Sequence, residues 1–294
     1  MYLFCFIIFI PLITKIKNLM RNIFNLLLII GISVKTYSQN FTDFESQPKG
    51  TAYTAVHWQS DGFIPGSFNE GLETRTMVDD SVAKSGKKSL RITYPKDHFG
   101  TEQTGCQIPL QFTPTNQMYM SYWIMFSENF SWGSKNEGGK LPGLAGGKRC
   151  SGGETCDGTN GFTARFMWRS DGKIVLYLYH MDKPSKYGED IDLVYPSGEA
   201  VVFKKGTWYQ LMERVKANSS PTSHDGEVEV WVNGQVVLLK SNLRFTTNGD
   251  EVDNLYISTF HGGHDAEWSP TTTCYTWIDD LHISPNKKDV ESKQ

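Results

Sequence analysis

Apolar and polar positions alternate along this chain over short stretches, which is the pattern of β-strands. Residues 89–94 place Ser, Arg and Thr on one side and Leu, Ile and Tyr on the other. Residues 118–130 form an apolar, aromatic run that predicts a strand buried on both faces. No long amphipathic helical pattern occurs. About a dozen such segments, separated by turn residues, predict an all-β protein with a sandwich or barrel in a single domain.

Two short turns predict β-hairpins. Asp171-Gly172 separates strands expected at 161–169 and 173–180, and Asn233-Gly234 lies within a hairpin expected over 223–243. Asp-Gly and Asn-Gly favour the two-residue turns that join antiparallel strands.

Other segments predict irregular structure. We expect strand, turn and strand over 41–60, a loop at 66–80 and a polar excursion at 181–198. Residues 132–161, rich in Gly and containing Pro142, predict a long irregular loop of a length that is usually functional. Residues 286–294 predict a frayed polar tail.

The first 38 residues predict an N-terminal extension followed by a secretory signal peptide. From Met20 onward, a basic start, an apolar run at 23–34 and small residues near 38 fit that plan, so residues 1–19 would precede the true start. The alternative is a membrane anchor, although each apolar run is shorter than the roughly 20 residues that span a bilayer. The prediction is a secreted or periplasmic chain whose main domain covers 39–285.

Four cysteines remain after signal removal, and an even number in an exported protein predicts two disulfides. Cys150 and Cys156 flank a short Gly-rich loop and form the expected local pair. That leaves Cys106 with Cys274 as a long-range pair. A metal site is the alternative, but neither the cysteine spacing nor nearby histidines favour it.

Charge is unevenly distributed. The whole chain has a formal charge of −3, but residues 133–173 hold seven Lys or Arg against four Asp or Glu. A positive region on an otherwise acidic protein favours a bound anion and argues against nucleic acid as the partner. A solvated charged loop is the alternative.

Five polar residues are placed so that they would share one site. Thr163 and Arg165 are two apart, as are Tyr177 and Tyr179, so each pair should project from one face of a strand. Lys140 stands at the head of the Pro/Gly-rich segment and would approach from a turn. Singly, each residue is ordinary for a strand or a turn. Together they predict a site for an acidic ligand.

These residues also carry a family resemblance. The segments KLPGLAGG and FTARFMWRSDGKIVLYLYH, supported by WVNGQ and STFHGG, resemble polysaccharide lyase family 14, with alginate and glucuronan lyases, over about residues 45–285. The strands EVEVWVNGQVV and DDLHIS resemble a concanavalin-like β-jelly roll. The resemblance implies a monomeric lyase that cleaves an acidic polysaccharide by β-elimination. Lys140 matches the family's catalytic lysine, and Thr163 departs from the Ser that is frequent at its position.

β-Elimination at a uronate assigns roles to these side chains. Arg165 suits the substrate carboxylate, because a guanidinium binds it bidentately and keeps its charge. Lys140 is either the base that takes the C5 proton or a cation that neutralises the carboxylate. Tyr177 or Tyr179 could be the acid or the base, and we assign Tyr179 as the acid. Thr163 would orient the carboxylate through its hydroxyl.

Further residues are candidates for substrate binding. The H-x-x-H motif of His261 and His264, with Trp268 after it, predicts a loop that contacts a glycan, and Gln103 and Gln107 could bind sugar hydroxyls. A zinc site at the two histidines is the alternative, but no further ligands stand at a convincing spacing.

Two competing functions remain open. A retaining glycosidase would need two carboxylates about 5–5.5 Å apart, and residues 227–230 or 189–192 could supply a pair. A glycan-binding module would explain the fold and the basic region without catalysis. No cofactor is expected, although a structural Ca²⁺ near Asp279-Asp280 is a possible addition.

Overall fold

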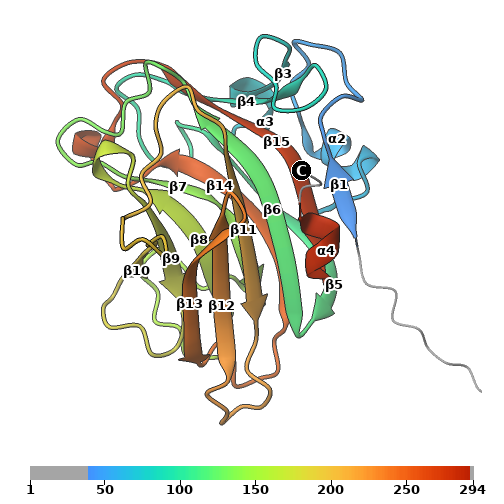
Figure 1. The fold of residues 1–294 in the computed structure, drawn as a ribbon, viewed down its shortest axis with the longest axis vertical. Coiled ribbons are helices and arrows are strands. Elements are labelled where there is room, and N and C mark those ends of the chain that lie inside the picture. Colours follow the sequence, from blue (N-terminus) through green and yellow to red (C-terminus); the bar gives the residue numbers. More distant parts are fainter. Residues whose placement is uncertain (1–38, 292–294) are drawn as a thin grey trace, which may run out of the picture. The chain divides into compact units, whose positions relative to one another are not determined.

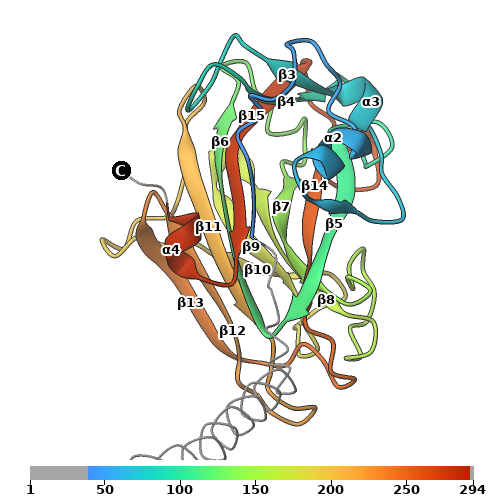
Figure 2. The ribbon, with the colours of Figure 1, turned by 90° about the vertical axis from the view of Figure 1, so that its right-hand side faces the viewer.

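The strands of this protein form two antiparallel sheets packed face to face, as Figures 1 and 2 show for the computed structural model, which describes residues 39–291. Sheet A has eight strands in the order β13-β12-β11-β6-β15-β4-β3, with β1 beside β15. Sheet B has seven, in the order β10-β9-β8-β7-β14-β5-β2. The predicted all-β sandwich of the jelly-roll type is confirmed.

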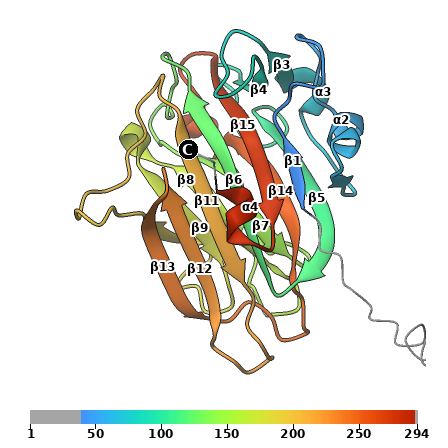
Figure 3. The same cartoon turned by 45° about the vertical axis from the view of Figure 1, so that its right-hand side comes forward.

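Figure 3 shows the strands of sheet A side by side. They are β1 (Asn40–Thr42), β3 (Thr76–Asp79), β4 (Ser89–Tyr94), β6 (Gln117–Phe126), β11 (Tyr209–Lys216), β12 (Gly226–Val232), β13 (Gln235–Leu243) and β15 (Cys274–Ser284). Those of sheet B are β2 (Ile64–Pro65), β5 (Cys106–Thr115), β7 (Gly139–Gly146), β8 (Phe162–Trp168), β9 (Ile174–Tyr179), β10 (Glu189–Asp192) and β14 (Val252–His261).

The core lies between the sheets and is filled by alternate residues of each strand. On β8, Phe162, Ala164, Phe166 and Trp168 enter the main hydrophobic core. The intervening side chains of β8 therefore project from the outer face of sheet B. This alternation decides which residues of sheet B can reach a ligand.

Both predicted hairpins are present. Strands β12 and β13 are joined at Asn233 and Gly234, whose φ angles are 49° and 78°. Strands β8 and β9 are joined through a 3₁₀ turn, Ser170–Gly172. Positive φ at two successive residues is the geometry that Asn-Gly accepts readily.

Three terminal and loop predictions were wrong. Within 41–60 the second element is a helix, α2 (Ala55–Ser60), where Trp58 is buried. Residues 66–80 include helix α3 (Leu72–Arg75) and strand β3. The tail contains helix α4 (Lys287–Val290), and Val290 is buried against Trp231 and Met212 of sheet A. One apolar side chain is enough to dock an otherwise polar tail.

The Gly/Pro-rich segment was also predicted wrongly, because β7 runs through it between β14 and β8. A Cβ on Gly143 would lie 2.0 Å from the carbonyl oxygen of Ala164, and one on Gly139 would lie 2.0 Å from the Trp168 ring. Here glycine allows strands to approach closely and does not mark a turn.

The cysteine predictions divide. Cys150 and Cys156 form a disulfide, as expected. Cys106 and Cys274 are free thiols, so their predicted bridge is wrong. Cys106 lies on β5 of sheet B and Cys274 on β15 of sheet A. Each thiol is buried on its own strand, and an even number of cysteines does not show which of them meet in the fold.

The predicted signal peptide falls on residues 1–38, which lie outside the described residues. Between residues 39 and 291, no helix is long and apolar enough to cross a membrane.

Candidate active site

A cleft of about 940 Å³ opens on the outer face of sheet B. Its floor comes from β5, β7, β8, β9 and β14, with β10 at one edge. Loop residues from 151–152, 184–188 and 263–268 complete its walls. The side chains that give it chemical character are Gln107, Lys140, Arg165, Met167, Arg169, Tyr177, Tyr179, Glu189, Asp190, Tyr256, His264 and Trp268.

Lys140 lies on β7 in the middle of the cleft floor, and not on a turn as predicted. Its Nζ lies 3.9 Å from the centre of the Tyr177 ring and 2.8 Å from the sulfur of Met167. Burial, followed by the nearby charges of Arg165 and Arg169, holds the pKa of this ammonium well below its ordinary value. A lysine whose pKa is lowered in this way gives up its proton more readily and can serve as a base.

Arg165 lies on β8 with only 3% of its surface exposed. Its Nη1 donates to Ser258 Oγ at 3.1 Å, and the guanidinium stands 5.1 Å from the Tyr256 ring. Among the described residues its Nε has no hydrogen-bond partner. Burial lowers its pKa, yet an arginine stays charged, so this side chain offers a fixed cation with a free donor.

The two predicted tyrosines lie side by side on β9. Their ring centres are 5.5 Å apart, and Tyr179 pairs with Thr163 while Tyr177 pairs with Arg165. Burial and the adjacent Tyr179 phenol raise the pKa of Tyr177. The oxygen of Tyr179 accepts a hydrogen bond of 2.9 Å from the backbone N–H of Gly153, inside the disulfide loop. The shared face of the hairpin is confirmed.

The prediction missed an ion pair at the edge of the cleft. Arg169 donates to both carboxylate oxygens of Asp190, at 2.7 and 2.6 Å. Asp190 stands on β10, a strand that the sequence pattern had assigned to a polar excursion. The two members of this pair have opposite effects on the pKa of Lys140, because Arg169 lowers it and Asp190 raises it.

Thr163 does not fill its predicted role. It is fully buried, and its hydroxyl donates to the carbonyl oxygen of Cys150 at 3.1 Å. Thr163 lies near the start of β8, against the disulfide loop, and is not part of the cleft lining. Thr163 therefore fastens the loop and does not orient a carboxylate.

The predicted histidine pair is split between core and solvent. On β14, Tyr256 and Phe260 line the cleft, so His261 points the opposite way and is fully buried beside Trp168. Burial lowers the pKa of His261 to about 4. The prediction that His261 binds substrate is wrong. His264 does line the cleft, as does Trp268.

The glutamines also differ from each other. Gln107 lines the cleft, where its oxygen accepts from the hydroxyls of Tyr256 at 2.7 Å and Ser258 at 3.0 Å. Gln103 is exposed on a loop and is not part of the lining. It falls outside the site because the chain turns into β5 only at Cys106.

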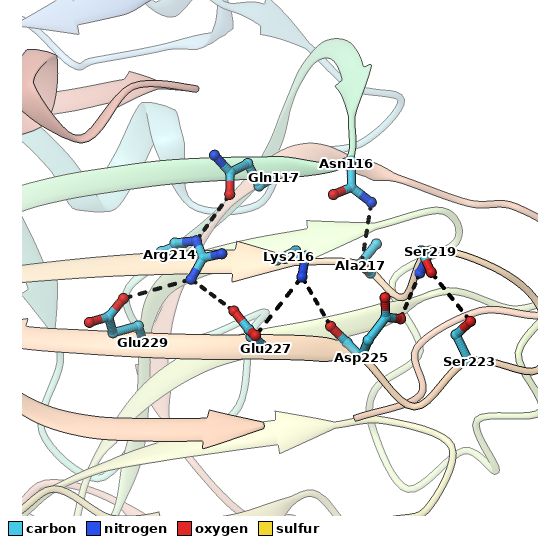
Figure 4. A network of polar contacts seen from close by, with 10 residues as sticks. All are labelled: Asn116, Gln117, Arg214, Lys216, Ala217, Ser219, Ser223, Asp225, Glu227 and Glu229. Carbon is cyan, nitrogen blue, oxygen red and sulfur yellow. Dashed lines mark hydrogen bonds and ion pairs between the residues drawn. The ribbon is translucent and has the colours of Figure 1, made fainter. Parts of the chain in front are cut away.

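The acid pair considered for a glycosidase lies on the other sheet. Glu227 and Glu229 project from β12 of sheet A, where Arg214 contacts them at 3.0 and 3.7 Å (Figure 4). The second pair, Asp190 and Asp192 of β10, is also engaged, since Lys173 contacts Asp192 at 2.7 Å. Both acid pairs are thus bound by cations, and although Asp190 lines the cleft, its carboxylate is held by Arg169.

Metal ligands are not gathered in the part of the chain from 39 to 291, where no three His, Cys, Asp or Glu side chains form a group suited to a metal ion. Asp279, considered for calcium, accepts the backbone N–H groups of Lys84 at 2.8 Å and Ser85 at 3.2 Å.

The cleft combines a low-pKa lysine, a buried guanidinium and two phenols within one face of three adjacent strands. These groups can bind a carboxylate, take a proton from a carbon beside it and return a proton to a leaving oxygen. That is the chemistry of elimination from a uronate.

Comparisons with known proteins place this fold among polysaccharide lyases. The structure resembles the alginate lyase Aly36B with a TM-score of 0.70 and 26% identity, over 84% of this chain and 96% of that one. It resembles the alginate lyase of Aplysia kurodai with a TM-score of 0.62 and 23% identity, over 81% and 97% of the chains. For an endo-β-1,4-glucuronan lyase of Trichoderma reesei the values are 0.52 and 12%, over 87% and 98%.

No protein of curated function matches this chain in sequence. A family match is nevertheless extensive, because the sequence model described as Polysaccharide lyase 14 covers residues 82–281. That span includes β4 to most of β15 and every strand that forms the cleft floor. With this match and the site it contains, the chain belongs to polysaccharide lyase family 14 and is a polysaccharide lyase.

Proposed function

We propose that this lyase cleaves a uronate polysaccharide outside the cytoplasm, with alginate the first expected substrate and glucuronan the second. The observation that carries the proposal is the position of Lys140 between two guanidiniums and against the Tyr177 ring, in a cleft open to a polymer. Arg169 is paired with Asp190, whereas Arg165 has no acidic partner among residues 39–291, so the carboxylate of an anionic sugar would supply its counter-charge.

In the proposed reaction, Arg165 binds the carboxylate at the sugar to be opened. Lys140, whose pKa is lowered by burial and by the nearby guanidiniums, takes the proton from C5 in its uncharged form. The C4–O4 bond then breaks as the C4–C5 double bond forms, and Tyr179 gives its proton to O4. The Gly153 N–H already donates to the Tyr179 oxygen, so the phenolic proton of Tyr179 is free for this transfer.

Solved complexes of a related enzyme support the choice of alginate. Variants of Aly36B with alanine in place of a lysine and a methionine, or of a lysine and a tyrosine, are described in complex with alginate tri- and tetrasaccharide. The same three residue types meet in this cleft, where Lys140 contacts both Met167 and Tyr177.

The test is ultraviolet absorbance of the protein with polymannuronate, polyguluronate and glucuronan, measured beside reducing ends. We expect absorbance from the conjugated double bond of a 4,5-unsaturated end, strongest with one alginate block. Reducing ends without absorbance would identify a hydrolase. Binding without either product would identify a glycan-binding module, and both results would contradict the proposal.

The pH dependence separates the two roles open to Lys140. A neutral base is active above its pKa, so the rate should rise with pH through the lowered pKa of Lys140. Arg169→Gln removes a cation and should raise that pKa, moving this acid limb to higher pH. Asp190→Asn removes an anion and should move it to lower pH.

The measurement is kcat against pH for the wild type and these two variants. If Lys140 acted as a cation instead, the same opposite displacements would occur on the alkaline limb. Profiles that do not move, or that move in one direction for both variants, would contradict any role for the titration of Lys140.

A further inference from the structure

Lys140 reaches the cleft only because β7 is irregular. In a regular strand, residues four apart lie on the same face. Leu144 is fully buried in the core, whereas Lys140, four residues before it, lines the cleft. A regular β7 would therefore turn one of these two side chains to the wrong side.

Relative to β8 the irregularity is one extra residue on β7, whereas relative to β14 the three steps from Lys140 to Gly143 match four, from Phe260 to Tyr256. Lys140 pairs with Met167 of β8, and Gly143 pairs with Arg165, so three steps along β7 match two along β8. Pro142 lies within this bulge, where a residue without a backbone N–H can be accommodated in a central strand. The bulge changes the direction of Lys140 relative to the rest of β7.

Two polar side chains from the opposite sheet bind the bulge. The hydroxyl of Tyr122 on β6 donates to the carbonyl oxygen of Pro142 at 3.2 Å. The backbone N–H of Leu144 donates to Glu213 Oε2 on β11 at 3.0 Å. Both contacts cross the core, from sheet A to the strand of sheet B that faces it (Figure 2).

Glu213 is expected to destabilise the fold, because its carboxyl is buried in the core. It is fully buried, with Leu211 and Val215 on either side of it along the same face of β11. Its Oε1 has no hydrogen-bond partner among residues 39–291. Burial raises the pKa of its carboxyl and so favours the uncharged form. Stability alone favours an aliphatic side chain at such a site, so we look for a function of the acceptor.

We propose that Glu213 is a positioning residue that, together with Tyr122, holds the β7 bulge and so aims Lys140 into the cleft. The inference rests on the catalytic role proposed for Lys140. Glu213 would thus influence the active site from the core of the sandwich, although its strand belongs to sheet A and the cleft floor belongs to sheet B.

Two substitutions at Glu213 test the acceptor. Glu213→Gln keeps the size and an oxygen that can accept from Leu144, and we expect kcat within about threefold of the wild type. Glu213→Leu keeps the approximate volume but removes the acceptor. We expect it to lower kcat by about 10- to 100-fold with KM little changed, since displacement of a reacting group by about 1 Å can have an effect of that size.

A second readout does not depend on turnover. The rate at which an amine-reactive reagent labels Lys140, followed by peptide mass spectrometry across pH, reports the titration of that amine. We expect this profile to move in Glu213→Leu and to be restored in Glu213→Gln. If the wild type fails to produce unsaturated ends, the proposed function fails, but the labelling still decides whether Glu213 positions Lys140.

Val215→Ala is the matched control, because it disturbs the same core strand without touching β7's polar contacts. It should lower thermal stability while leaving kcat and the labelling profile near wild type. Should Glu213→Leu not fold, Tyr122→Phe removes the other contact with little change of volume, and we expect a loss of about three- to tenfold in kcat. An unchanged kcat and labelling profile in the folded variants would overturn the proposal. Equal losses of kcat in Glu213→Gln and Glu213→Leu would also overturn it.

Discussion

Lys140→Ala is expected to reduce kcat on the best uronate polymer by about 10³-fold or more, because it removes both the proposed base and a cation from the cleft. The fold should persist, since alanine removes an amine whose charged form is already disfavoured by burial and by the nearby guanidiniums. The measurement is the initial rate of absorbance increase, with thermal unfolding monitored in parallel.

Lys148→Ala is the matched control, an exposed lysine eight residues away that is not part of the cleft lining. It should retain wild-type activity. Partial rescue of Lys140→Ala by added small amines would point to the base role. An alanine variant that keeps more than about a tenth of the wild-type kcat would remove Lys140 from the mechanism.

Arg165→Lys is expected to lower kcat/KM by about 10²-fold. The substitution keeps a positive charge but loses the planar pair of donors that can hold a carboxylate while Nη1 stays on Ser258. Arg165→Met should be worse for catalysis yet not strongly destabilising, because an apolar side chain can replace a buried charge. Both are measured by steady-state kinetics on the same polymer.

Arg214→Lys offers the corresponding control on sheet A. Arg214 contacts Glu227 and Glu229 there (Figure 4) and takes no part in the cleft. It should change stability only slightly and leave kcat/KM unaltered. Equal activity losses in the Arg165 and Arg214 variants would show that the effect is general and not local to the site.

The sequence was sufficient for the sandwich and for the shared face of the β8–β9 hairpin. A short Asp-Gly turn sets the register between its strands, so Arg165 and Tyr177 had to become neighbours once the hairpin formed. Lys140 was correctly placed in this group but on the wrong element. Gly and Pro in a sequence usually indicate a loop. Nothing in the local sequence shows that Gly143 is needed because the backbone of β8 approaches it closely.

Two errors came from treating polar residues as exposed. Counting along β14 from Tyr256 would have assigned His261 to the core face, opposite to the cleft. Similarly, alternation along β11 places Glu213 on the core face. It was not predicted because the candidate residues were sought only in the cleft. The Arg169–Asp190 pair could not be found this way, because it joins β10 to the end of a strand two places away in the sheet.

The disulfide loop makes assembly of the catalytic cleft sensitive to the compartment in which the chain resides. The loop closed by the Cys150–Cys156 disulfide contains Gly153, whose backbone N–H donates a hydrogen bond to the Tyr179 oxygen. The carbonyl oxygen of Cys150 accepts a hydrogen bond from the Thr163 hydroxyl. In a reducing cytosol both sheets could form, but the wall beside Tyr179 would lack its covalent closure. The oxidised loop is therefore expected to be the form in which Tyr179 is held in place for catalysis.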